Sequence, residues 1–328
     1  MKQILIIGGG SIGERHLRCF LRTGRAEVAL CDVNESLRSG VAARYNVAQT
    51  FASLSDALKA TFDAAVICTP AHLHIPMAID IARQNMGILI EKPLSTSLDH
   101  IDELQKETEA RGLSVSVAYV LRHHPALVAV RQCVLSGTYG RPVQIVFTGG
   151  QHFPFYRPAY RDTYYTRHAT GGGAIQDALT HIVNAAEWIV GPVTRLVADA
   201  EHFLLDGVDV EDTVHLITRH DTIMGAFSLN QHQAPNETTL TVICERGTVR
   251  YEAHAARWLT CTEPNSAWKV EEEFRIERDD MFLNQAHAFL DQLDGKAAPA
   301  CSLSEARQTL FVNLAELKSI ESGSWIRL

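Results

Sequence analysis

Short apolar runs alternate with amphipathic segments along the first 120 residues. The first run, Ile4–Ile7, is followed by glycines and is typical of a strand that is buried on both faces of a parallel sheet. Comparable runs lie at residues 27–31, 64–68, 87–90 and 113–118. Helical segments are predicted between the runs, at residues 12–21, 34–45, 72–84 and 97–111. This alternation predicts an α/β domain with a doubly wound parallel sheet.

The pattern changes after residue 120. From residue 193 to about 272, strand-like runs such as VHLIT and TTLTVI follow one another without helices, which predicts a mostly antiparallel sheet. Other elements are predicted at residues 123–136 (helix), 141–149 (strand), 174–189 (helix), 279–293 (helix) and 303–321 (helix), followed by a short terminal strand.

A chain of 328 residues is long enough for two domains. We therefore expect an α/β domain over residues 1–120 and an α+β domain over residues 121–328. The helix at about 303–321 is expected to pack back on the first domain.

A glycine-rich turn connects the first predicted strand to the first helix. Gly8, Gly10 and Gly13 form G-x-G-x-x-G, in which the glycines allow a tight turn, close approach of the backbone to a pyrophosphate, and helix–strand packing. Ser11 and Ile12 begin the helix, whose free N–H groups favour a phosphate. The turn therefore predicts a dinucleotide site.

An acidic residue ends the second predicted strand. Asp32 lies 19 residues after Gly13, where a carboxylate can accept hydrogen bonds from ribose hydroxyls. It favours NAD over NADP, because it would repel a 2′-phosphate. Arg38 lies six residues further on and could reach such a phosphate.

Two further strand ends carry polar residues toward the same edge of the sheet. Thr69 and Pro70 follow the third predicted strand, and Glu91, Lys92 and a proline follow the fourth. Because ligands bind outside the carboxyl ends of such strands, we expect cofactor contacts from Thr69, Pro70, His74, Glu91 and Lys92.

Lys92 is a candidate catalytic group. Beside a nicotinamide, a lysine can hydrogen-bond a reacting hydroxyl and stabilise alkoxide character. The alternative is an ordinary surface lysine. His72 and His74 are two residues apart and cannot share a helix face, and further zinc ligands are not apparent near them. We therefore predict no metal site.

Asp177 and His181 are four residues apart on a predicted helix that follows three glycines, and so they share a face. A histidine is a suitable base for an alcohol proton, and a carboxylate can orient it or hold the substrate. The alternative is a surface acid with a core histidine that a carbonyl satisfies.

The segment 151–170 is rich in Tyr, Arg and His. Tyr156, Arg157, Arg161 and Tyr164 are candidate residues for binding a polar substrate, and the arginines would suit a carboxylate or phosphate. An ordinary surface loop or a subunit contact is the alternative.

Composition limits the partners. The formal net charge is −8, without a Lys/Arg cluster, which argues against a nucleic-acid partner. Seven cysteines are scattered without a C-x-x-C pair, which is typical of reduced thiols in the cytoplasm. The apolar N-terminus is only as long as a strand, so we expect neither a signal peptide nor a membrane span.

Together these stretches resemble the Gfo/Idh/MocA oxidoreductases, the family of glucose–fructose oxidoreductase and inositol dehydrogenase. The matching stretches are GGGSIGERH (8–16), CTPAHLH (68–74), EKP (91–93), LRHHP (121–125) and GGGAIQDALTH (171–181). The resemblance implies an N-terminal Rossmann domain and a C-terminal domain whose open sheet often makes homo-oligomer contacts, as in a dimer or tetramer. It also implies a site shared by the two domains.

By resemblance, Lys92, Asp177 and His181 match the family's catalytic lysine, aspartate and histidine. They imply hydride transfer between a hydroxyl carbon of a sugar, polyol or sugar acid and nicotinamide C4, with Arg122 contributing to substrate binding. Many members carry an asparagine shortly before this arginine, whereas this chain has Tyr119. We therefore transfer no specific sugar.

Three other functions are compatible with the scaffold. An NAD-dependent glycosidase would oxidise its sugar only transiently. A dinucleotide-sensing regulator would bind the cofactor without catalysis, although it would not need the lysine, aspartate and histidine. An imine or tetrapyrrole reductase would use the reduced cofactor.

Overall fold

A computed structural model describes all 328 residues, which form two compact units. The N-terminal unit comprises Met1–Val120 and Glu277–Arg307, and the C-terminal unit comprises Leu121–Ile276 and Gln308–Leu328. We expected residues 121–328 to form one domain, whereas Glu277–Arg307 belong to the first unit.

The N-terminal unit is built on a six-stranded parallel sheet in the order β3-β2-β1-β4-β5-β6. Its strands are β1 (Lys2–Ile7), β2 (Ala26–Cys31), β3 (Thr50–Phe51), β4 (Ala64–Ile67), β5 (Gly87–Ile90) and β6 (Val115–Val117). Every residue of β4 and β5 is buried, as expected for strands covered on both faces. The predicted doubly wound sheet is confirmed.

The helices of this unit are α1 (Ser11–Arg22), α2 (Glu35–Tyr45), α3 (Leu54–Ala57), α4 (His74–Arg83), α5 (Ile101–Ala110) and α9 (Asp280–Leu293). The sequence did not predict α3 or β3, because four and two residues are too few to display a period.

Helix α9 joins the N-terminal unit through its apolar face. Phe282, Phe289 and Leu290 are buried in the same core as Leu17 and Phe20 of α1. The rings of Phe20 and Phe289 meet edge to face, with centroids 6.3 Å apart. Periodicity predicts such a helix but not the sheet it covers, which explains why the expected domain boundary differs from the structure.

The C-terminal unit contains a nine-stranded sheet in the order β14-β13-β12-β11-β7-β10-β9-β8-β15. Its strands are β7 (Pro142–Gly150), β8 (Arg195–Glu201), β9 (Thr213–His220), β10 (Ile223–Asn230), β11 (Glu237–Cys244), β12 (Gly247–Glu252), β13 (Arg257–Cys261), β14 (Lys269–Glu273) and β15 (Ile326–Arg327). Only β7 and β10 pair in parallel, so the predicted mostly antiparallel sheet is confirmed.

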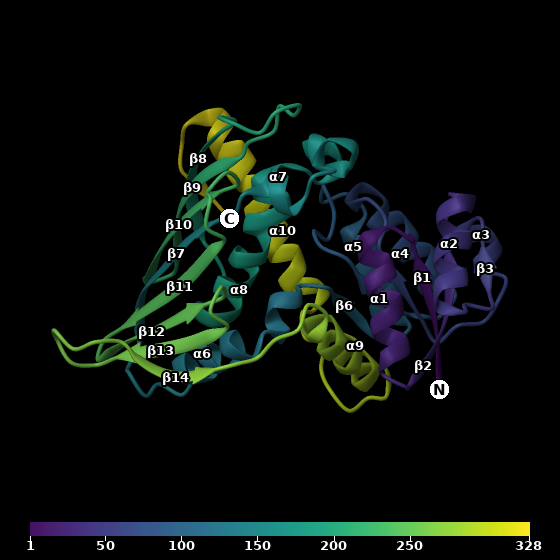
Figure 1. Cartoon of the computed structure of the whole chain (residues 1–328), viewed down its shortest axis with the longest axis horizontal. Coiled ribbons are helices and arrows are strands. Elements are labelled where there is room, and N and C mark those ends of the chain that lie inside the picture. The colour runs from purple at the N-terminus through teal and green to yellow at the C-terminus, as the bar shows by residue number, and fades with distance from the viewer. The chain divides into compact units, whose positions relative to one another are not determined.

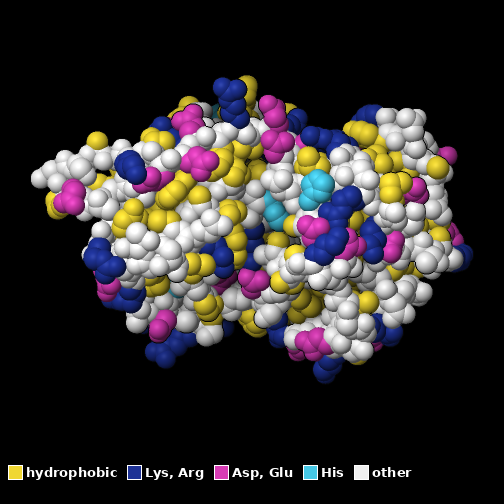
Figure 2. Space-filling view, turned by 90° about the horizontal axis from the view of Figure 1, so that it is seen from below, with side chains coloured by type: hydrophobic (Ala, Val, Ile, Leu, Met, Phe, Trp, Pro, Cys, Tyr) yellow, Lys and Arg dark blue, Asp and Glu magenta, His cyan; other side chains and the backbone are white.

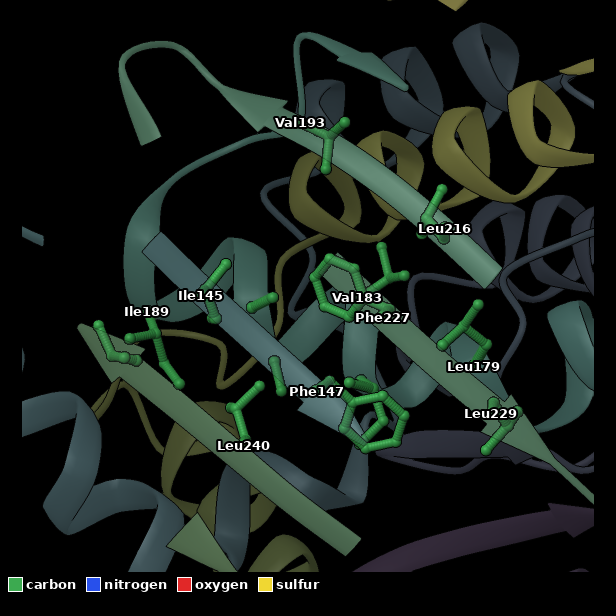
Figure 3. Packing of buried hydrophobic residues seen from close by; sticks show 14 of the residues in the cluster. Ile145, Phe147, Leu179, Val183, Ile189, Val193, Leu216, Phe227, Leu229 and Leu240 are labelled. Carbon is green, nitrogen blue, oxygen red and sulfur yellow. The ribbon is translucent and has the colours of Figure 1, made fainter. Parts of the chain in front are cut away.

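Helices cover one face of this sheet (Figure 1). They include α6 (Pro125–Leu135), α8 (Thr180–Val190) and α10 (Leu303–Ser322), and the short α7 (Phe153–Tyr156) follows β7. Figure 3 shows the core between these layers, where Phe147 of β7 and Phe227 of β10 lie close to Leu179 and Val183. This core fixes the helix that carries Asp177 and His181 against a rigid sheet.

On the face seen in Figure 2, acidic and basic side chains are interspersed rather than gathered by sign. None of the helices combines the length and the hydrophobicity needed to cross a membrane.

Candidate active site

The glycine turn has the local geometry of a phosphate cradle. Gly8 has φ +93°, and a Cβ there would lie 2.8 Å from the carbonyl oxygen of Cys68. A Cβ at Gly13 would overlap the carbonyl oxygen of Gly8, whereas a Cβ at Gly10 would meet nothing within 4 Å. The first and third glycines are therefore needed for packing, and the second leaves open space at the N-terminus of α1. These features fit the pyrophosphate of a dinucleotide.

Asp32 is fixed beside this turn. Its Oδ2 accepts the N–H of Gly9 at 2.6 Å, and its Oδ1 accepts the N–H of Asn34 at 2.7 Å. Arg38 donates from Nη1 to the main-chain carbonyl of Asp32 at 2.6 Å. The carboxylate keeps further lone pairs for ribose hydroxyls, and Arg38 is anchored next to it.

His74 connects two of the predicted strand ends. Its buried ring lies 2.8 Å from the Thr69 carbonyl through Nε2 and 3.0 Å from the Pro93 carbonyl through Nδ1. Both nitrogens thus face main-chain carbonyl oxygens within this unit. Burial lowers the pKa of His74, so the neutral ring has one N–H and donates to one of these two carbonyls. His74 orders the loops after β4 and β5, and the partly exposed Thr69 and the exposed Pro70 lie in the first of these loops.

Glu91 is also bound within the N-terminal unit. His16 Nε2 lies 2.6 Å from Glu91 Oε1, and the main-chain N–H of Lys92 donates to Glu91 Oε2 at 3.0 Å. Burial raises the pKa of Glu91, but the hydrogen bond and charge of His16 and the charge of Lys92 outweigh burial, so the pKa lies below its ordinary value. Glu91 is therefore an anion next to the half-buried Lys92.

His16 was not assigned a role from the sequence. The signal was present, because His16 lies three residues after Gly13, on the buried side of the helix with Leu17 and Phe20. A polar side chain in such a position needs a buried partner.

In the C-terminal unit, Asp177 lies in a π-helical turn, Ile175–Leu179, directly before α8. The sequence predicted a regular helix here, and π turns are frequent at functional sites. Residues four apart remain close to one full turn apart in this wider helix, so Asp177 and His181 stay on one side. Asp177 is buried, and its Oδ1 accepts the hydroxyl of Tyr164 at 2.6 Å.

Glu211 caps the same helix. Its Oε1 accepts the N–H of Ile175 at 2.9 Å, and its Oε2 lies 2.5 Å from Nε2 of His168. The hydrogen bond to Glu211 raises the pKa of His168, against the opposing effect of burial. A Cβ on Gly173 would lie 2.5 Å from the Glu211 carboxylate. Gly173 is thus needed because any side chain there would collide with the Glu211 carboxylate that caps this helix.

The Arg/Tyr-rich segment is partly structural. Phe153, Tyr160 and Tyr165 form a small buried cluster with Leu205, Val208 and Val210. Arg161 donates from Nε to the Asp206 carbonyl at 2.7 Å and from Nη2 to the Asp206 carboxylate at 3.1 Å. The charge of Arg161 is therefore balanced by Asp206, and this ion pair ties the Arg/Tyr-rich segment to the loop that contains Asp206.

The other predicted substrate residues differ in exposure. Tyr156 is 45% exposed, and Arg157 is exposed beside it. Arg122 is buried, donates from Nε to Asn184 Oδ1 at 2.8 Å, and lies over the Trp188 ring. This anchoring gives Arg122 a structural role that the sequence did not predict. No set of three or more His, Cys, Asp or Glu side chains is arranged to hold a metal ion.

Comparisons with known proteins agree with these features. The profile described as "Oxidoreductase family, NAD-binding Rossmann fold" matches residues 2–119, and that of the "GFO/IDH/MocA C-terminal domain" matches residues 127–250. The inositol 2-dehydrogenase of Rubrobacter xylanophilus is 27% identical over 56% of this chain, and the matched part is only about half of that protein (51%). The myo-inositol 2-dehydrogenase of Thermotoga maritima is 21% identical over 99% of this chain and 98% of its own length.

Solved structures extend the similarity over the whole chain. The WlbA dehydrogenase from Bordetella pertussis, in complex with NADH and UDP-GlcNAcA, is 26% identical, covers 100% of this chain and 98% of its own, and has a TM-score of 0.85. A levoglucosan dehydrogenase in complex with NADH and levoglucosan has a TM-score of 0.90 over 99% of both chains, at 18% identity, a likeness of fold.

Proposed function

The chain belongs to the Gfo/Idh/MocA family of oxidoreductases, and on this premise we propose that it is an NAD-dependent dehydrogenase acting on a hydroxyl carbon of a sugar, polyol or sugar acid. The observation that carries the proposal is the glycine turn with open space at Gly10 and with Asp32 fixed beside it. Several relatives that match the chain are named as dehydrogenases of inositol.

NAD, when bound, would accept the hydride at nicotinamide C4. The remaining chemistry is proton transfer and charge stabilisation by the protein. We assign His181 as the base that takes the hydroxyl proton. Lys92 donates a hydrogen bond to the substrate oxygen and stabilises alkoxide character. Asp177 positions the substrate and the histidine, and the Tyr164 hydroxyl supports this carboxylate.

The preference for NAD over NADP follows from Asp32. A carboxylate that already accepts two main-chain N–H groups is held in place and would repel a 2′-phosphate. Arg38, bonded to the carbonyl of the same residue, is the group that could offset part of this repulsion.

We propose that a polar, multiply hydroxylated substrate lies against the C-terminal unit. The exposed loop side chains Tyr156, Arg157, Arg161 and Tyr164 are candidates for binding it, and Arg157 would favour a sugar acid. If Arg157→Ala leaves KM for the true substrate unchanged while wild-type turnover is robust, the anionic preference is excluded.

The test of the proposed function is NADH formation from NAD⁺, compared with NADP⁺, over a panel of inositols, aldoses and sugar acids. His181→Ala should depress kcat by roughly 10²–10⁴-fold, and Lys92→Ala should abolish most of the signal. Near-normal turnover of His181→Ala would remove the histidine from this role. Bound cofactor with glycosidic cleavage and no net NADH would establish the glycosidase instead, and cofactor binding without any turnover would favour the sensor.

We further propose that the protein is a homo-oligomer and that it resides in the cytoplasm. The nine-stranded sheet exposes large apolar side chains, with Ile217 44%, Met224 43% and Val270 44% exposed. Ile217 and Met224 lie on neighbouring strands. None of the seven cysteines forms a disulfide, which suits a reducing compartment. Light scattering on a size-exclusion column should give a dimer or tetramer, and a monomer at micromolar concentration would exclude this.

A further inference from the structure

A buried histidine–glutamate pair connects the first helix to the segment that follows β5. His16 lies on α1 and is fully buried, and Glu91 is 6% exposed. Their Nε2 and Oε1 atoms are 2.6 Å apart although the residues are 75 positions apart in the chain. Since the carboxylate is ionised, Nε2 carries the proton and donates. The pair therefore fixes both the ring of His16 and the carboxylate of Glu91.

The second oxygen of Glu91 holds the main chain of the next residue. It accepts the N–H of Lys92 at 3.0 Å, so the direction in which the chain leaves β5 depends on the carboxylate. A buried carboxylate that lost its only side-chain donor would keep only the Lys92 N–H and the nearby charge of Lys92, which is unfavourable for a buried anion. It would then move toward water, and the Lys92 N–H would lose its acceptor.

The ring of His16 is itself constrained. Phe282 of α9 meets it edge to face, with centroids 5.5 Å apart, and no partner is found for Nδ1. The ring thus makes one hydrogen bond only, the one to Glu91, and is held for that purpose by packing. If His16 only filled space, an apolar residue of similar size would serve equally well at this position.

The helix that carries His16 also carries the glycine turn. Gly10 is the N-cap of α1, and the open space at Gly10 marks where a pyrophosphate fits. The pair therefore joins the helix that would hold the cofactor to the peptide of the proposed catalytic lysine.

We propose that His16 is a positioning residue for Lys92, acting through Glu91, and that it sets the lysine backbone relative to the cofactor-binding helix. This inference rests on the proposed function, in which Lys92 acts on the substrate oxygen. The competing explanation is that the pair contributes only to the stability of the fold.

The test compares His16→Phe, which fills the site without a donor, with His16→Gln, whose amide can still donate to Glu91. In His16→Phe we expect kcat to fall on the order of 10²-fold, the loss typical of a small misplacement of a catalytic group, with KM for NAD⁺ changed less than about threefold. His16→Gln should recover most of the loss. Cys19→Ala, which removes a buried side chain from the same helix, is the matched control and should leave kcat near the wild-type value.

A second measurement does not depend on turnover. Hydrogen exchange of the Lys92 amide should accelerate in His16→Phe and not in His16→Gln, while the amides of Leu89 and Ile90 in β5 stay protected. This measurement separates the positioning role of His16 from the proposed dehydrogenase function. If the enzyme proved inactive on every substrate, the change in amide exchange could still be measured. The inference is overturned if the Lys92 amide exchanges at the wild-type rate in His16→Phe, or if it exchanges faster while kcat stays unchanged. It is also overturned if Cys19→Ala loses as much kcat as His16→Phe.

Discussion

Gly10 and Gly13 lie three residues apart in one turn but have different surroundings. A Cβ at Gly13 would overlap the Gly8 carbonyl, so Gly13→Ala should destabilise the N-terminal unit by about 1–3 kcal/mol. A Cβ at Gly10 would meet open space, and the φ of −62° there suits any residue. Gly10→Ala should therefore change stability by less than about 1 kcal/mol and weaken NAD binding.

Thermal unfolding and calorimetric NAD titration measure the two effects separately. The expected pattern is a lowered midpoint for Gly13→Ala, and a raised Kd at a nearly unchanged midpoint for Gly10→Ala. If Gly10→Ala binds NAD as tightly as the wild type, the pyrophosphate does not lie against this glycine.

Tyr164 supports the proposed catalytic carboxylate. Its hydroxyl donates to Asp177 at 2.6 Å, and a hydrogen bond to a charged group contributes about 1.5–3 kcal/mol. Because Tyr164 is 39% exposed, the lower end applies, and Tyr164→Phe should reduce kcat by roughly tenfold. The unfolding midpoint should change little.

A matched control is available in the N-terminal unit, where Tyr45 donates its hydroxyl to Glu14 at 2.8 Å. Tyr45→Phe removes the same kind of bond at a carboxylate with no proposed catalytic role and should leave kcat unchanged. Equal kinetic losses in both variants would show that the effect of Tyr164→Phe is not specific to Asp177.

At the scale of elements, α8 and α10 are joined by a buried polar ladder. Asn313 Nδ2 donates to Thr180 Oγ1 at 2.9 Å, Asn184 Nδ2 donates to Thr309 Oγ1 at 2.9 Å, and Thr309 donates to Glu187 at 2.7 Å. The ladder fixes the register of the helix that carries His181. One turn further along α10, Glu316 is fully buried and neither carboxylate oxygen has a partner.

The buried Glu316 makes the stability of the C-terminal unit depend on pH. Burial raises the pKa of Glu316 well above its ordinary value, and the charges of Glu211 and Glu187 raise it further. The folded protein therefore keeps a proton that the unfolded chain releases. This contribution is complete below the unfolded pKa and is lost as pH rises toward the folded pKa, with a slope of at most about 1.4 kcal/mol per pH unit.

We expect Glu316→Gln, which resembles the protonated acid in shape, to raise the unfolding midpoint more at pH 8 than at pH 5. Glu187, whose pKa burial also raises, is present in both proteins, so the difference between them reports Glu316 and its electrostatic coupling to Glu187. Glu321→Gln, an exposed carboxylate on the same helix, is the control. A midpoint difference that is independent of pH would mean that Glu316 is ionised in the folded protein.

Most elements were predictable because their signals are local. The runs at Ile4–Ile7 and 64–67 and the spacing of the glycines are properties of adjacent residues. The partners of Glu91 and Asp177 were not predictable, because they come from residues 75 and 13 positions away. The π turn at Ile175–Leu179 also has no distinct periodic signature.

At the scale of the molecule, the return of Glu277–Arg307 to the N-terminal unit has consequences for its stability. Helix α9 contributes Phe282, Phe289 and Leu290 to the core around α1. Burial of three such side chains contributes roughly 5–9 kcal/mol, which is comparable to the whole stability of a domain, about 5–15 kcal/mol. The N-terminus of α9 is also fixed by an ion pair, since Arg18 donates two hydrogen bonds of 2.6 Å to the Asp279 carboxylate.

A fragment of residues 1–120 should therefore not unfold cooperatively, although it contains all six strands of the parallel sheet and the glycine turn. The same fragment joined to residues 277–307 by a flexible Gly/Ser linker should show a cooperative thermal transition and bind NAD, because the added segment supplies the apolar face of α9. Phe289→Asp in the joined fragment keeps the length and removes the packing, and it should behave as residues 1–120 do. Equal midpoints and equal NAD affinity for the short and the joined fragments would show that α9 covers the sheet without stabilising it.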